Sequence, residues 1–74
     1  MLEEETKQVT GVVVDCMKLN VRSAPNRNAE VIYALNAGDR VLIEEGNSTK
    51  EYYNVYTAAG IEGYCAKEYI AIEG

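Results

Sequence analysis

The sequence LNVRSAP at residues 19–25 carries the clearest structural signal in the chain. Its first four residues alternate between apolar and polar side chains, which is typical of a strand with one buried and one solvated face. Leu19 and Val21 are therefore predicted to point into a core, and Asn20 and Arg22 to point outward. The Ser-Ala-Pro that follows is rich in turn-forming residues and ends the strand.

Similar turn signals recur along the rest of the chain, at residues 36–39, 46–48 and 58–60 and at Gly63. Between them lie short segments rich in Val, Ile and Tyr, none of which shows helical periodicity. This spacing predicts an all-β barrel or sandwich of five to six short antiparallel strands, with a 3₁₀ turn before the last strand. The strand segments are residues 9–14, 19–22, 31–35, 40–45, 51–57, 61–66 and 70–72, and the 3₁₀ turn is at residues 67–69.

Strand alternation also assigns side chains to faces in the later segments. Val41 and Ile43 are predicted to point inward. In the Tyr-rich segment at residues 51–57, Tyr53 and Val55 share the core face, with Tyr53 packed beside Val55. The opposite face of that segment carries Tyr52, Asn54 and Tyr56.

Length and charge restrict the class of protein. The 74 residues make one domain, predicted at residues 9–74 and preceded by an acidic flexible linker at residues 1–8. The linker has no basic start and no apolar run, so it is not a signal peptide. We interpret the chain as a domain of a longer exported protein; a cytoplasmic protein is the alternative. No apolar run is long enough to span a bilayer, so no membrane partner is expected.

Charge is unevenly distributed along a chain whose net charge is −5. Residues 16–29 contain three basic side chains and no acidic one, whereas residues 44–74 contain six acidic and two basic side chains. Three scattered cations in an acidic protein do not form the continuous basic surface that phosphate backbones require. Nucleic acid is therefore not an expected partner.

Catalytic and metal chemistry find little support in the sequence. The chain has no histidine, which removes the commonest general base and any Ser–His or Cys–His nucleophile. Cys16 and Cys65 do not have the number or spacing of zinc ligands, so no metal or other cofactor is expected. We interpret the two cysteines as small buried apolar residues, with a disulfide between them as the alternative. We expect no enzyme activity.

Six tyrosines in a chain without Phe or Trp are the main compositional anomaly. Tyrosine combines a flat apolar face with a hydroxyl group and suits recognition of peptides and sugars. Tyr53 is expected in the core and Tyr33 has no clear assignment. The expected contact residues are Tyr52, Tyr56, Tyr64 and Tyr69.

The opening motif closely resembles that of bacterial SH3 (SH3b) domains, and the resemblance covers about residues 9–73. The further matching segments are VI at 31–32, GDRV at 38–41, YYNV at 52–55, GYCA at 63–66 and EYI at 68–70. The resemblance implies a small SH3-like barrel. This chain departs from the family pattern by placing Tyr where Trp is usual, by Ala24 in place of Gly, and by Tyr33 in place of a small residue.

The resemblance implies a non-catalytic module that holds a secreted or surface protein on the bacterial cell wall, through the peptide stems or cross-bridges of peptidoglycan. The expected site is a shallow groove lined by Tyr52, Tyr64 and Tyr69, with polar rims from Asn54 and Asn20. Tyr56 is a further candidate contact. The domain is expected to act as a monomer.

Two other functions are possible for the same fold. One alternative is a spacer or regulatory domain that packs on a neighbouring catalytic domain of its parent protein. Residues 63–70 are also similar to the end of eukaryotic SH3 domains, which bind proline-rich peptides. However, Ala66 replaces the groove proline of those domains, and the 16–29 segment is basic where theirs is acidic. A proline-rich ligand is therefore the less favoured alternative.

Overall fold

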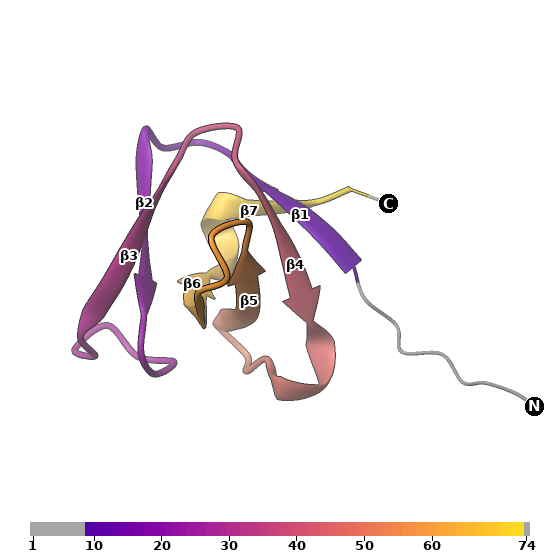
Figure 1. Cartoon of the computed structure of the whole chain (residues 1–74). Helices are drawn as coiled ribbons and strands as arrows, with labels where there is room; N and C mark the ends of the chain where they lie inside the picture. The colour runs from indigo at the N-terminus through magenta and orange to yellow at the C-terminus, as the bar shows by residue number, and fades with distance from the viewer. Residues whose placement is uncertain (1–8, 74) are drawn as a thin grey trace, which may run out of the picture.

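The computed structural model describes residues 9–73 and contains seven strands that form one curled antiparallel sheet (Figure 1). The predicted linker at residues 1–8 lies outside the described residues. The strands are β1 (Val9–Val13), β2 (Lys18–Arg22), β3 (Val31–Asn36), β4 (Arg40–Glu44), β5 (Tyr52–Thr57), β6 (Glu62–Ala66) and β7 (Ile70–Ile72). Two 3₁₀ turns, η1 (Glu45–Asn47) and η2 (Lys67–Tyr69), precede β5 and β7. The all-β, SH3-like fold is confirmed, but the described residues contain seven strands and not the predicted five to six, because every predicted segment, including the short one at residues 70–72, forms a separate strand.

The sheet follows the order β3-β2-β6-β5-β4-β1-β7, so strands distant in sequence become neighbours. β1 pairs with both β4 and β7, which brings the two ends of the domain together. β2 and β3 form a hairpin that extends to one side of the other strands in Figure 1. The hairpin joins the rest of the sheet where Arg22 of β2 pairs with Tyr64 of β6.

The core lies inside the curled sheet, on the face that strand alternation predicted. Leu19 and Val21 of β2 are 6% and 0% exposed, and Val41 and Ile43 of β4 are 3% and 0% exposed. Burial of such branched side chains contributes about 1.5–3 kcal/mol each, and in a domain of this size the core is the main source of stability. The remaining buried core residues are Val13, Leu35, Val55, Cys65 and Ile70.

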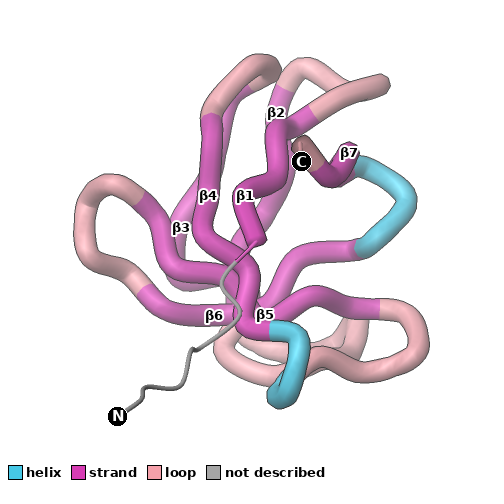
Figure 2. The backbone as a smooth tube through the Cα atoms, turned by 90° about the vertical axis from the view of Figure 1, so that its right-hand side faces the viewer, coloured by secondary structure: helices cyan, strands magenta, loops and turns pink. Residues whose placement is uncertain are grey.

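The backbone path in Figure 2 shows where the loops and turns lie between the strands. The 3₁₀ turn predicted at residues 67–69 is confirmed as η2. A second 3₁₀ turn, η1, was not predicted; it ends β4 one residue before the expected boundary at Glu45. Ser48 stabilises this turn, because its hydroxyl donates a hydrogen bond to the backbone oxygen of Glu44 at 3.0 Å.

Both cysteines are free thiols that pack with the core. Cys65 is completely buried and Cys16 is half-buried, so the interpretation of small apolar residues is confirmed for Cys65. Burial, with a smaller contribution from nearby Cys16, raises the pKa of the Cys65 thiol to about 12. A buried thiol with a raised pKa is a poor nucleophile.

We expect a thiol reagent at about pH 8 to modify Cys16 in the folded protein and Cys65 only after unfolding. Counting the modified thiols before and after addition of urea measures this difference, and equal rates for both in the folded protein would contradict it.

The raised pKa of Cys65 also means that folding favours the protonated thiol. Its contribution to stability is complete below the ordinary pKa of 9.0 and is lost as the pH rises through about 12.

Candidate ligand-binding groove

Strand register decides which side chains of β5 and β6 face outward. Directly paired residues of antiparallel strands project to the same face. Tyr52 pairs with Ala66 and Asn54 pairs with Tyr64, which places these four residues on the outer face of the sheet. Tyr53 lies on the opposite face and packs against the core, as predicted.

Two adjoining hollows lie on this outer face, and together we call them the groove. The first has a volume of about 260 Å³ and lies between β2, β6 and η2. The second has a volume of about 790 Å³ and lies between the β2–β3 loop, the start of β5 and the end of β6. Tyr52 and Ala66 line both hollows, so a single extended ligand can pass from one to the other across Tyr52.

The first hollow brings together three of the six residues that the sequence singled out: Asn20, Tyr52 and Tyr69. Asn20 comes from β2, Tyr52 from β5 and Tyr69 from η2, so the site is assembled from three parts of the chain. Asn20 is exposed, whereas the two tyrosines are half-buried. Half-burial holds each ring in place while leaving part of its surface available to a ligand.

Tyr64 was expected to line the groove, but it lines neither hollow. It is half-buried and pairs with Arg22 on one side and Asn54 on the other. The guanidinium of Arg22 donates a hydrogen bond to the backbone oxygen of Ala29 at 2.9 Å, which ties the β2–β3 loop to its strand. The Arg22–Tyr64 pair therefore supports the wall of the groove from β2 and β6.

Asn54 does not form a polar rim of the groove, because it is only 2% exposed. Its side-chain amide donates hydrogen bonds to Oε2 of Glu62 at 3.2 Å and to the backbone oxygen of Gly63 at 3.1 Å. Its backbone N–H donates to the hydroxyl of Ser48 at 3.0 Å. Alternation places Asn54 on the same face as Tyr52, but its side chain is buried and is used in hydrogen bonds to β6.

Tyr56 is 50% exposed but lies apart from the groove. It pairs with Leu42 of β4 and Glu62 of β6, and lines a separate hollow of about 160 Å³ with them. The predicted contact residues on β5 are therefore divided: Tyr52 is in the groove, and Asn54 and Tyr56 are not.

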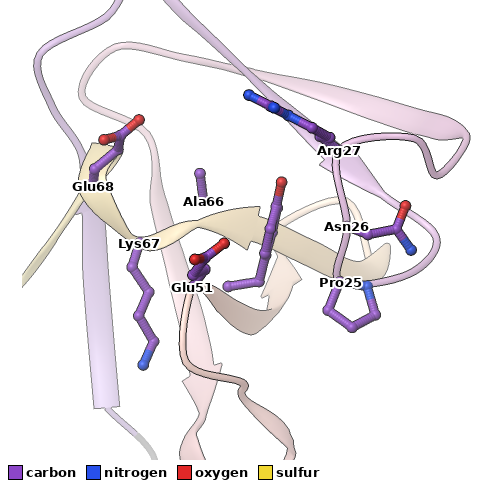
Figure 3. A pocket seen from close by; sticks show the side chains of 8 residues that line it. Pro25, Asn26, Arg27, Glu51, Ala66, Lys67 and Glu68 are labelled. Atoms are coloured by element: carbon purple, nitrogen blue, oxygen red, sulfur yellow. The ribbon is translucent and has the colours of Figure 1, made fainter.

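The second hollow contains residues that were not predicted from the sequence (Figure 3). Pro25 and Arg27 come from the β2–β3 loop, Glu51 precedes β5, and Glu68 belongs to η2. The uneven charge along the sequence was the available signal. The basic 16–29 segment contributes Arg27 to one wall of this hollow, and the acidic 44–74 segment contributes Glu51 and Glu68 to the opposite wall.

The curled seven-stranded sheet defines a small SH3-like β-barrel domain. A family model described as "Bacterial SH3 domain" matches residues 18–71. The chain therefore belongs to the bacterial SH3 domain family, a family of binding domains that are generally not catalytic. No curated protein matches the sequence. β1 lies outside the matched segment but pairs with β4 and β7, so the domain extends beyond that segment.

Neither a membrane span nor a metal cluster is found in the part of the chain that the structure describes. No helix there is long and apolar enough to cross a membrane. Residues 9–73 bring together no group of three or more potential His, Cys, Asp or Glu metal ligands.

Proposed function

We propose that this domain is a non-catalytic targeting module that holds a larger exported protein on the bacterial cell wall, by binding a peptide part of peptidoglycan in the groove. One observation carries the proposal: Asn20, Tyr52 and Tyr69 meet in one hollow of a bacterial SH3 domain. Flat aromatic faces with a polar group beside them suit an extended peptide. The domain acts as a monomer outside the bacterial cytoplasm.

Tyr52 is the expected anchor of this interaction because it is the aromatic residue common to both hollows. A ligand that packs on its ring gains apolar contact without leaving the groove. The groove is shallow and only partly apolar, so a single domain binds weakly. Affinity for the wall then comes from several copies or from cooperation with neighbouring domains, which raise the effective concentration.

Sedimentation with purified bacterial cell walls tests the proposal. Tyr52→Ala is expected to lower the association constant about 10-fold, since buried aromatic anchors carry much of the energy of such interfaces. Tyr56→Ala is the matched control, because it removes the same side chain outside the groove and is expected to leave binding unchanged. Circular dichroism checks that both variants are folded. Failure of the original domain to sediment above an unrelated acidic protein, or equal losses in both variants, would reject the proposal.

One feature favours a second function, packing against a neighbouring domain of the parent protein. β3 is at the end of the sheet order, and three consecutive large apolar residues on it are exposed. Val31, Ile32 and Tyr33 are 44%, 40% and 37% exposed. Exposed apolar edges are usually covered in soluble proteins. Hydrogen exchange in the full parent protein separates the two functions: protection of β3 supports packing, and protection of the groove by cell-wall fragments supports targeting.

A further inference from the structure

The second hollow of the groove contains charges of both signs on opposite walls. Arg27 extends from the β2–β3 loop on one side, and Glu51 and Glu68 stand on the other (Figure 3). The floor between them includes Ala66 and Tyr52, which carry no charge. A ligand in this hollow therefore meets a cation on one side and carboxylates on the other.

These charges are not used within the described part of the fold. The one ion pair among residues 9–73 joins Arg40 and Glu73, which do not line the groove. Lys67 also lines the hollow, but its ammonium lies 5.0 Å from the centre of the Tyr53 ring and points away from Arg27 in Figure 3. Arg27, Glu51 and Glu68 are exposed and make no side-chain hydrogen bond within residues 9–73.

Each sign of charge has a natural ligand group. A guanidinium offers a planar pair of N–H donors that fits a carboxylate. A carboxylate accepts hydrogen bonds from an ammonium group. A purely anionic ligand would be repelled by Glu51 and Glu68, and a purely cationic one would be repelled by Arg27. In either case the repulsion would offset part of the electrostatic attraction. A ligand with both groups satisfies both walls at once.

We propose that the groove selects peptides that carry an ammonium group and a carboxylate group close together, a proposal that rests on the proposed function. Arg27 binds the carboxylate, Glu51 and Glu68 bind the ammonium, and the chain between the two groups packs on Tyr52. Ligand charge is thereby the basis of selectivity, while the tyrosines supply contact area. Because the three charged residues are exposed, the selectivity is moderate and is reduced by salt.

A set of four peptides tests this inference. The parent is N-acetyl-Ala-Lys-Ala, which keeps one lysine ammonium and one terminal carboxylate. The other three have an acetylated lysine, an amidated C-terminus, or both changes. Titration of the isotope-labelled domain, followed by amide chemical shifts, is expected to show about 3- to 5-fold weaker binding for each single change at low salt. The differences are expected to diminish at about 0.5 M salt.

Variants of the domain assign each charge to its partner. Arg27→Gln is expected to abolish the discrimination between carboxylate and amide, while the combined Glu51→Gln and Glu68→Gln changes abolish the discrimination between lysine and acetyl-lysine. In each case the effects of the domain change and of the ligand change are not additive, which is expected when the two changed groups are in direct contact. Arg40→Gln is the control, since it removes a cation outside the groove and is expected to change neither preference.

The outcomes separate this inference from the proposed function. Equal binding of all four peptides, or no saturation by the parent peptide, overturns the charge selectivity, and cell-wall sedimentation then judges the targeting function on its own. Conversely, charge-dependent peptide binding by a domain that does not sediment with cell walls supports the selectivity and rejects the cell-wall target.

Discussion

Replacing Ile43 by alanine is expected to lower the free energy of unfolding by about 3 kcal/mol. Ile43 is 0% exposed and lies on β4 between Val9 of β1 and Val55 of β5. When its branched side chain is removed, apolar contacts are lost and a cavity remains, because the three paired strands cannot move together to fill it. A 74-residue domain has a total stability of roughly 4–11 kcal/mol, so this loss is a large fraction of it.

Urea denaturation measures this loss, and Leu42→Ala is the matched control. Leu42 is the adjacent residue on β4 but is 42% exposed on the outer face, so its replacement is expected to cost less than about 1 kcal/mol. Both variants remove the same number of carbon atoms from one strand. Similar losses in the two variants would show that β4 does not present alternate residues to the core.

Gly63→Ala is expected to destabilise the domain by about 2–3 kcal/mol and to weaken ligand binding as well. A Cβ atom at Gly63 would lie 2.5 Å from Cγ1 of Val21 and 2.7 Å from the backbone oxygen of Arg22. The second contact is the decisive one, because a backbone oxygen in a strand cannot rotate away. β2 must therefore move from β6, and the side of the groove that carries Asn20 moves with it.

Gly46→Ala provides the comparison for this variant. A Cβ atom at Gly46 would have no neighbour within 4 Å, so its replacement is expected to change stability by less than about 0.5 kcal/mol. Both changes reduce the flexibility of the unfolded chain in the same way, and the difference between them isolates the steric clash. Thermal unfolding and cell-wall sedimentation are the two measurements. Equal stability of the two variants would contradict the close contact between β2 and β6.

The Ile43 and Gly63 variants test two different requirements for the groove. Ile43 holds the curled sheet together, whereas Gly63 allows the β2–β3 hairpin to approach β6. Without that approach Asn20 would not share a hollow with Tyr52 and Tyr69. In the proposed function, the ligand site therefore depends on a glycine that does not itself touch the ligand.

Local alternation was sufficient to predict much of the fold. Leu19, Val21, Val41 and Ile43 are buried as expected, and Tyr53 packs on the core. Side chains of a strand alternate between two faces regardless of what the strand pairs with, so a few residues of sequence decide this property. The family resemblance at residues 19–25 was likewise readable from the sequence, and the family match over residues 18–71 confirms it.

The groove was only partly predictable, because its composition depends on which segments become neighbours. Tyr52 and Tyr69 line one hollow as expected. Asn54 is buried against β6, Tyr64 lines neither hollow, and Tyr56 faces a separate one. Alternation gives the side of a strand on which a residue lies. It does not say which neighbouring strand or loop the side chain contacts there.

The sequence by itself determined where the strands lie, which residues of β2 and β4 are buried, and the family, since these follow from short-range patterns of apolar and polar residues. The tertiary structure alone decided that Arg27 stands opposite Glu51 and Glu68 across one hollow. These residues lie more than 20 positions apart along the chain, and only the pairing of β2 with β6 brings their segments together. Basic and acidic residues from distant parts of the sequence therefore line the same hollow. Long-range strand pairing, and not local sequence, sets the neighbours of each loop.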